Sequence, residues 1–153
     1  RPLFRTRLVS EDKLSMYEYK AEVDRVVDGD TIDVNIWLGF DVVLPKQRIR
    51  LFGIDTPESR TRNKEEKIRG LLSKHYLEDI CPKGKFLRLE SKERGKFGRI
   101  LGILYLDSDN ININQKMCDD NYAVPYFGGN KDGLEGLHME NKQRLIQLGV
   151  LEG

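Results

Sequence analysis

The sequence of 153 residues is poor in the residue types that define several protein classes. It has only 2 cysteines, Cys81 and Cys118, which excludes a disulfide framework, and no spacing of cysteine and histidine resembles a zinc site. We expect two ordinary thiols in a reduced compartment, with a single bridge as the open alternative. No apolar run approaches the roughly 18 residues that cross a bilayer, and the amino-terminal residues lack the apolar core of a secretion signal. These absences argue against a membrane protein and against a precursor that still carries its signal.

The chain also lacks an excess of either charge, since 26 Lys and Arg stand against 25 Asp and Glu. The distribution is more informative than the total. Residues 46–74 carry 9 basic and 4 acidic side chains, and residues 83–99 carry 7 basic and 2 acidic ones. A solvated surface is the usual explanation of such windows, so they favour a phosphate-binding face only modestly.

The length is typical of one domain, and 39% hydrophobic residues are enough for a core. Residues 1–15 are rich in charge and follow no clean period. We interpret them as a leader, a linker, the end of an upstream region or a segment added for expression, and we expect a single domain over residues 16–153.

Alternation of apolar and polar residues predicts strands in five places. The first three, Tyr17–Val27, Thr31–Leu38 and Val42–Ile54, are joined by turns and predict an antiparallel meander, with Pro45 at an edge or a bulge. The other two cover Lys85–Ser91 and Arg99–Leu106.

Spacing of 3.6 residues between apolar positions predicts a helix over residues 64–80, with Ile68, Leu71, Leu72, Tyr76 and Ile80 on its apolar face. Gly70 weakens the interior of this helix and could mark a later start. Two further helices are predicted at Ile113–Tyr122 and Leu134–Leu148. The last one places Leu134, Leu137, Asn141, Leu145 and Leu148 on one face, which we interpret as core.

The predicted order is three strands, a helix, two strands and two helices. Five strands with a helix between the third and the fourth is the order of an OB-type barrel, a scaffold often used on nucleic acids. The sequence therefore predicts an α+β fold, mainly β, built as a five-stranded OB-type barrel with three helices.

Chemistry-bearing residues fall in four short segments. They are the acidic turn Asp28–Thr31, the strand end Arg50–Glu58, the basic loop Lys96–Arg99 and the aromatic loop Tyr122–Gly129. Each segment alone is weak evidence, because such residues are common in turns. Their joint occurrence in this order is much more specific.

Phosphodiester hydrolysis would use these residue types together. A hard divalent cation prefers oxygen ligands, which Asp30, Asp55 and the Thr56 carbonyl could supply. Glu58 could orient or deprotonate the attacking water. The charge that develops on phosphorus needs fixed positive donors, and Arg50 and Arg99 suit that task because a guanidinium matches two phosphate oxygens.

At these residues the sequence resembles the staphylococcal nuclease (thermonuclease) family of metal-dependent nucleases built on an OB barrel. The resemblance runs from Tyr17 to the carboxyl terminus and is strongest in Val27–Thr31, Arg50–Glu58 and Gly98–Arg99. It implies Ca²⁺ as the cofactor, with Asp30, Asp55 and the Thr56 carbonyl as ligands.

The resemblance also implies roles for the remaining site residues. Glu58 would act on the attacking water as general base or orient it, and Arg50 and Arg99 would bind the scissile phosphate. Lys96, Phe97 and Tyr126 would contribute to substrate binding. The implied activity is cleavage of DNA, and of RNA as well, with loss of the 5′-oxygen and 3′-phosphate products.

The chain departs from the family at Phe97, where a well-known member has tyrosine, so that a phosphate-contacting hydroxyl is missing. We expect a weaker contact to a terminal 3′-phosphate, with stacking on a base retained. The segment after Glu58 also differs and is rich in Arg and Lys. These departures bear on substrate preference rather than on the chemistry.

Two other classes of function compete with a nuclease. A non-catalytic OB module could bind single strands through stacking and charge, and a barrel could bind a protein or peptide. Neither has a reason to need the full set of carboxylates and arginines. We expect a monomer that acts on DNA or RNA, with no protein partner evident and no contact with a membrane.

The two histidines, His75 and His138, fall on predicted helices, and we interpret them as structural or solvated. Trp37 is more simply explained by packing on the barrel surface than by stacking on a base. The cellular setting stays open between an internal or virus-encoded nuclease and an exported one with an upstream signal.

Overall fold

The computed structural model describes residues 17–95, 98–106 and 109–153. Within these residues, five strands close into a barrel with the order β3-β2-β1-β5-β6, in which β3 and β6 pair in parallel. The strands are β1 (Tyr17–Asp28), β2 (Thr31–Gly39), β3 (Val42–Leu51), β5 (Phe86–Arg94) and β6 (Ile100–Leu106). This closed mixed barrel confirms the predicted OB-type fold and its antiparallel meander. The expected leader, residues 1–15, lies outside the described residues.

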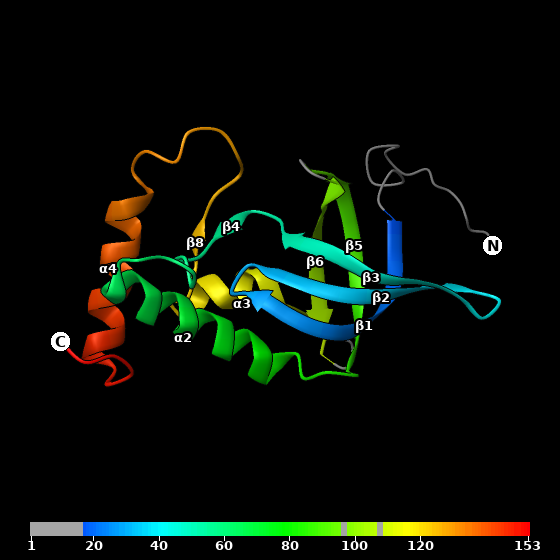
Figure 1. The fold of residues 1–153 in the computed structure, drawn as a ribbon, viewed down its shortest axis with the longest axis horizontal. Helices are drawn as coiled ribbons and strands as arrows, with labels where there is room; N and C mark the ends of the chain where they lie inside the picture. Colours follow the sequence, from blue (N-terminus) through cyan, green and yellow to red (C-terminus); the bar gives the residue numbers. More distant parts are fainter. Residues whose placement is uncertain (1–16, 96–97, 107–108) are drawn as a thin grey trace.

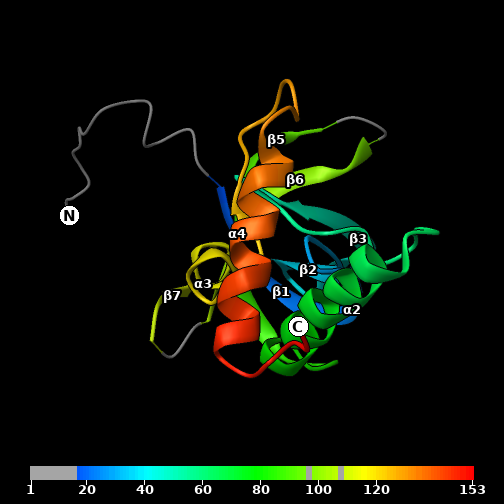
Figure 2. The same cartoon turned by 90° about the vertical axis from the view of Figure 1, so that its left-hand side faces the viewer.

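The helices gather at one end of the barrel, and the β2–β3 hairpin projects at the other end (Figure 1). The part of the chain that the structure describes has three helices, which are α2 (Lys64–Ile80), α3 (Ile113–Asp119) and α4 (Leu134–Gln147). Figure 2 shows α4 in front of the barrel end, between α2 and α3. None of the described helices is long and apolar enough to span a membrane.

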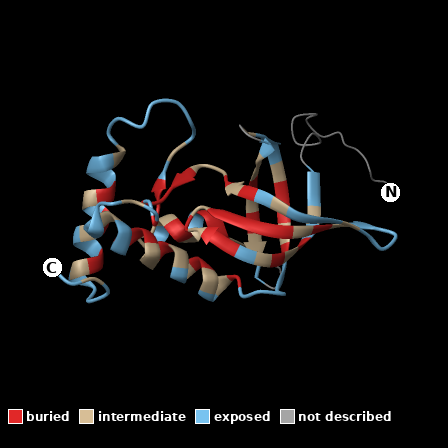
Figure 3. Ribbon diagram, in the orientation of Figure 1, coloured by how far each residue is buried: buried red, intermediate tan, exposed pale blue. Residues whose placement is uncertain are grey.

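The core lies inside the barrel and beneath the helices. Aliphatic side chains of the strands point inward, and the most deeply buried ones include Ile32 and Val34 on β2 and Leu89 on β5. Buried segments therefore concentrate in the barrel and α3, while the hairpin end is exposed (Figure 3). The Asp28–Gly29–Asp30 turn joins β1 to β2 at the helical end, where the polar site residues lie.

The third strand is shorter than the sequence suggested. It ends at Leu51 rather than at Ile54, because the chain turns at Gly53, whose φ of +83° favours glycine. The short strand β4 (Ile54–Asp55) then leaves the barrel and pairs with β8 (Val124–Pro125) in a second, two-stranded sheet. The short strand β7 (Ile111–Asn112) pairs with β6. None of these two-residue strands carries an alternation long enough to be predicted.

Helix α2 begins at Lys64 and continues through Gly70, so the suggested later start is wrong. Asn63 caps the helix by accepting a hydrogen bond from the Glu66 amide at 3.1 Å. The predicted apolar face is only partly correct. Tyr76 and Ile80 pack against the core. The buried residues, however, are Arg69, Gly70, Ser73 and Leu77, and Ile68 is 56% exposed. Contact with a neighbouring segment, and not hydrophobicity alone, therefore sets the buried face.

The segment that carries Glu58 approaches α2 closely at Gly70. A Cβ placed on Gly70 would lie 2.6 Å from the amide nitrogen of Ser59 and closer still to the backbone of Glu58. Only glycine fits between α2 and this segment, so Gly70 permits the contact and its helix propensity is secondary.

Helix α4 buries a more polar face than the sequence predicted. Its buried residues are His138, Asn141 and Leu145, whereas Leu137 and Leu148 are exposed, so the interpretation of the leucine stripe as core is only partly correct. Asn141 donates to the carbonyl of Ala123 at 2.9 Å and thereby ties α4 to the segment that leads into β8.

Both cysteines are free thiols. Burial raises the pKa of Cys81 to about 12 and that of Cys118 to about 11. Neither thiol is therefore an activated nucleophile.

Candidate active site

Two carboxylates and one arginine meet where the β1–β2 turn lies beside the end of β3. The Arg50 Nη2 atom is 3.4 Å from Asp30 Oδ2 and 3.5 Å from Asp55 Oδ1. All three side chains are largely buried, with exposed fractions of 14%, 13% and 12% for Arg50, Asp30 and Asp55. One guanidinium therefore bridges two carboxylates that lie 25 residues apart in the sequence.

Backbone pairing explains why these residues meet. Thr31 pairs with Arg50 in the β2–β3 ladder, and the Leu51 amide donates to the carbonyl of Asp30 at 2.8 Å. The Arg50 Nη1 atom donates to the carbonyls of Leu51 and Ile54 at 2.9 Å each. The guanidinium is thus fixed by the backbone of the turn that ends β3.

Asp30 is oriented by its two neighbours. Its Oδ1 atom accepts from the Thr31 hydroxyl at 2.9 Å, and its Oδ2 atom accepts from the Thr56 amide at 3.3 Å. The second contact joins the acidic turn to the segment after β4. Asp30, Asp55 and Thr56, which were predicted as one ligand set, are therefore brought together.

Asp55 has further partners from the carboxyl-terminal part of the chain. The His138 Nε2 atom lies 3.0 Å from Asp55 Oδ2, and the Lys131 Nζ atom lies 3.2 Å from Asp55 Oδ1. Burial by itself would raise the pKa of Asp55, but the hydrogen bond from His138 and the charge of Lys131 outweigh it and lower the pKa. Asp55 is held as a carboxylate anion.

The sequence did not predict the contacts that His138 and Lys131 make with Asp55. His138 is buried on the same face of α4 as Asn141 and Leu145, at a spacing of three and then four residues. That spacing is the signal that could have indicated a polar buried face. Lys131 lies in the exposed loop before α4, and nothing in its sequence context distinguishes it from other surface lysines.

The negative charges of nearby carboxylates, Asp30 and Asp55 among them, act on Glu58. It is exposed, and its amide donates to Glu66 Oε2 at 3.2 Å. Partial desolvation raises the pKa of Glu58, and the charges of Asp28, Asp30 and Asp55 raise it further. A carboxylate with a raised pKa is a stronger base than an ordinary glutamate, which is what proton transfer from water requires.

The neighbouring residues of Glu58 fix its segment. The Ser59 hydroxyl makes a short hydrogen bond to Asp28 Oδ1, which ties the segment to the acidic turn. Gly70 of α2 contacts the backbone of the same segment. The loop that carries Glu58 is therefore held between the barrel and α2.

Arg99 lies just before the start of β6, next to β3. It directly precedes Ile100, which pairs with Ile49, so Arg99 is near Arg48. Both arginines line a cavity of about 620 Å³ together with Asp33, Lys46 and Gly98. The cationic donors predicted for one phosphate are thus spread along β3 and the start of β6.

Of the three predicted substrate-binding residues, Tyr126 is described, and Lys96 and Phe97 lie outside the described residues. The Tyr126 hydroxyl donates to the carbonyl of Gly129 at 2.6 Å. The Lys131 Nζ atom lies 5.3 Å from the centre of its ring. Tyr126 therefore belongs to the loop that places Lys131 beside Asp55.

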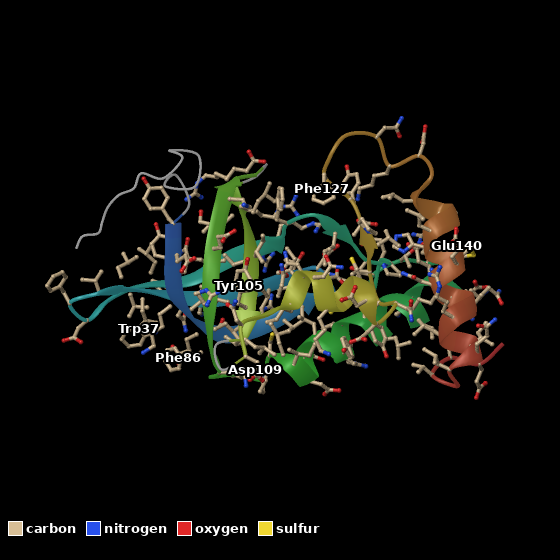
Figure 4. The ribbon with its side chains drawn as sticks, turned by 180° about the vertical axis from the view of Figure 1, so that it is seen from behind. Trp37, Phe86, Tyr105, Asp109, Phe127 and Glu140 are labelled. Carbon is tan, nitrogen blue, oxygen red and sulfur yellow. The ribbon has the colours of Figure 1, made fainter. Side chains whose placement is uncertain are left out.

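The aromatic loop also covers the turn after β3. The ring of Phe127 lies edge-on to Phe52 at 5.7 Å and so close to Gly53 that a Cβ there would be 2.8 Å away. Figure 4 shows Phe127 on the loop after β8, well apart from Trp37 and Phe86, which lie together. The rings of Trp37 and Phe86 are 6.1 Å apart, in agreement with packing on the barrel surface.

The donor set suits a hard divalent cation. Within the described residues no group of three or more His, Cys, Asp or Glu side chains forms a ready-made metal site. Asp30 and Asp55 nevertheless share one cationic partner, Arg50, and the Thr56 amide donates to Asp30, so the three residues of the expected ligand set are neighbours. An incoming cation would compete with Arg50 and Lys131 for carboxylate oxygens. Water and substrate phosphate would have to complete its shell.

Comparison with known proteins identifies a family and several similar sequences. A family model described as staphylococcal nuclease homologue matches residues 48–147, which include Arg50, Asp55, Glu58 and Arg99. The chain is 32% identical over 117 residues to an endonuclease, YhcR, of Bacillus subtilis. That match covers 72% of this chain and 9% of the longer relative.

Two relatives of more similar length carry nuclease names. The chain is 28% identical over 143 residues to a micrococcal nuclease of Shigella flexneri, a match that covers 87% of this chain and 74% of the relative. It is 28% identical over 106 residues to a thermonuclease of Staphylococcus intermedius, with 69% of this chain and 58% of the relative covered.

Proposed function

The chain belongs to the staphylococcal nuclease family, whose relatives are hydrolases that act on nucleic acids, and from this premise we propose that it is a Ca²⁺-dependent phosphodiesterase. Its substrate is DNA, with RNA as a second substrate, and its products end in a 3′-phosphate. One observation carries the proposal: Arg50 bridges the buried carboxylates of Asp30 and Asp55 at 3.4 and 3.5 Å. A module that only binds nucleic acid has no need of buried acids beside an anionic ligand.

In the proposed site Asp30, Asp55 and the Thr56 carbonyl would hold the cation. When bound, Ca²⁺ supplies positive charge that neutralises the carboxylates and the phosphate oxygens. His138 and Lys131 keep Asp55 ionised and fixed in place. The oxygen donors are thereby oriented before substrate arrives, which is the condition for electrostatic stabilisation without reorganisation.

The remaining residues act on water and phosphate. Glu58 accepts a proton from a water molecule as the water oxygen forms a bond to phosphorus. The bond from phosphorus to the 5′-oxygen breaks in line, and this oxygen leaves with its electron pair and gains a proton to become a hydroxyl. Arg50 and Arg99 donate to the phosphate oxygens while the negative charge on them grows.

The deciding experiment incubates plasmid, single-stranded DNA and RNA with the protein in Ca²⁺, Mg²⁺ or EGTA, followed by end-group analysis. We expect cleavage in Ca²⁺, 3′-phosphate and 5′-hydroxyl ends, and no cleavage in EGTA. Glu58→Gln, which keeps size and removes the base, is the matched control for contaminating nucleases. Binding without cleavage under every condition would favour the non-catalytic OB module instead.

A further inference from the structure

A groove rich in positive charge continues from the proposed active site along β3. It is the cavity of about 620 Å³ lined by Asp33, Lys46, Arg48, Gly98 and Arg99, here called the β3 groove. Three of its lining side chains are cationic and one is acidic. Because Arg99 lines the groove, the groove begins at a residue that the proposed mechanism places on the scissile phosphate.

Strand geometry sets Arg48 in line with Arg50. The two residues are two positions apart on β3 and share one face of the strand, at a spacing of about 6.6 Å. Arg50 pairs with Thr31 in the β2–β3 ladder, and Arg48 pairs with Asp33. The same face of β3 therefore carries one guanidinium at the carboxylate cluster and the next one in the groove.

The guanidinium of Arg48 is oriented by a two-point contact. Its Nε atom donates to Asp33 Oδ1 at 2.9 Å and its Nη2 atom to Asp33 Oδ2 at 3.1 Å. Arg25 donates to the same carboxylate at 3.3 Å from β1. The charge of Asp33 is therefore met by two arginines, and the groove as a whole remains positive.

A bulge directs Lys46 into the groove. The β2–β3 register shifts between Val34 and Ile36, and Lys46 adopts a left-handed φ of +52°. The Asn35 side chain accepts from the Lys46 amide at 3.0 Å and holds this conformation. A left-handed backbone costs free energy at a residue other than glycine, and a regular strand would avoid this cost. The placement of Lys46 in the groove explains why the bulge is present.

We propose that the β3 groove is a second phosphate-binding subsite for the substrate strand. It binds the sugar–phosphate backbone at a phosphodiester next to the one that is cleaved, through Lys46 and Arg48. Arg suits this task because its planar fork engages two phosphate oxygens, and Lys adds a point charge. This inference rests on the proposed function, since it needs a nucleic acid strand across Arg50 and Arg99.

The test measures the binding of labelled single-stranded DNA at several KCl concentrations. The protein carries Glu58→Gln so that the DNA stays intact, and the variants add Lys46→Asn, Arg48→Gln or both. Each lost phosphate contact should reduce the magnitude of the negative slope of log K against log [KCl] by about 0.7. The double variant should reduce it by about twice that amount. Asparagine tolerates the left-handed conformation at position 46, so this exposed substitution keeps the fold.

One control separates the subsite from general effects. Lys83→Gln removes an exposed charge elsewhere on the surface and should not change the slope. In the cleaving protein, Lys46→Asn and Arg48→Gln should raise KM several-fold and keep kcat within about twofold, because a remote phosphate is bound equally before and during reaction.

The outcomes distinguish the subsite from the function on which it rests. If the wild-type chain neither binds nor cleaves DNA, the proposed function is wrong and the subsite is rejected with it. If the wild-type chain cleaves DNA but both groove variants keep its slope and its KM, the subsite alone is wrong.

Discussion

The Nε2 atom of His138 lies 3.0 Å from Oδ2 of Asp55, although the two residues are 83 positions apart. A helix near the end of the chain thus fixes a carboxylate at the end of a short strand. The contact is buried on both sides, with 10% and 12% of the two side chains exposed. It makes α4 part of the candidate active site rather than a cover over the barrel.

His138→Ala should therefore weaken metal binding. Residues that orient a metal ligand typically contribute about 10-fold to 100-fold in affinity or activity. We expect the Ca²⁺ concentration for half-maximal activity to rise by about that factor, with partial rescue in His138→Gln, whose amide can still donate. His75→Gln is the matched control, because His75 is exposed on α2. Equal Ca²⁺ dependence in His138→Ala and wild type would contradict the positioning role.

Arg50→Ala, Arg99→Ala and Glu58→Ala should each lower kcat by a factor on the order of 10²–10³, since each removes a group that acts on the developing charge or on the attacking water. Circular dichroism should show that each variant remains folded. Near-wild-type cleavage by any one of them would remove that residue from the proposed mechanism.

Chelation should stop the reaction reversibly. EGTA removes the cation that Asp30 and Asp55 are proposed to hold, and added Ca²⁺ in excess of EGTA should restore the rate. Asp30→Asn weakens the charge of the ligand set, so it should need more Ca²⁺ for the same rate. Cleavage that continues unchanged in EGTA would refute the assignment of calcium.

Gly70→Ala should destabilise the protein although alanine favours helices. The added Cβ would lie 2.6 Å from the Ser59 amide nitrogen, so α2 or the segment that carries Glu58 must shift. We expect a loss of about 1–3 kcal/mol in the free energy of unfolding, together with reduced activity. Gly136→Ala on α4 is the control, since a Cβ there meets nothing within 4 Å and should add about 0.5–1 kcal/mol. Denaturant unfolding measures both, and a stabilised Gly70→Ala variant would contradict the close approach.

Asp33 should make stability depend on pH in the acid range. The hydrogen bond from Arg48 is the main cause that lowers the pKa of Asp33 below its ordinary value of 3.8, and the bond from Arg25 adds to it. The stabilisation is therefore fully present above pH 4 and is lost as the pH falls through the lowered pKa. Asp33→Asn should cost about 1–2 kcal/mol at pH 7, and this cost should shrink as the pH falls through the lowered pKa, as measured by denaturant unfolding. A difference that is independent of pH would show that Asp33 does not act through its charge.

The elements with long, regular patterns could be predicted from the sequence. The alternation in β1 and β2 and the Asp28–Gly29 turn determine the meander, because a half-buried strand and a tight hairpin leave local traces. The short strands β4 and β8 could not be predicted, because they exist only through their pairing with each other.

The helices show the same limit in a different form. Their positions follow from apolar spacing, but their buried faces follow from it only in part. Gly70 and Ser73 are buried because a neighbouring backbone approaches α2, and His138 is buried because Asp55 accepts its hydrogen bond. Hydrophobic periodicity predicts the burial of apolar side chains. It does not predict burial that results from a close backbone contact or from a polar hydrogen-bond partner.

The sequence by itself determined the barrel, the order of its main elements and the presence of the carboxylates and arginines of the proposed site. These depend on local alternation, on turn residues and on residue types, all of which can be read along the chain. Only the tertiary structure decided that Arg50 bridges Asp30 and Asp55, that His138 and Lys131 join them, and that Arg99 lies beside Arg48. Such contacts join distant segments, and their geometry is set by strand register and helix placement, which no single stretch of sequence contains.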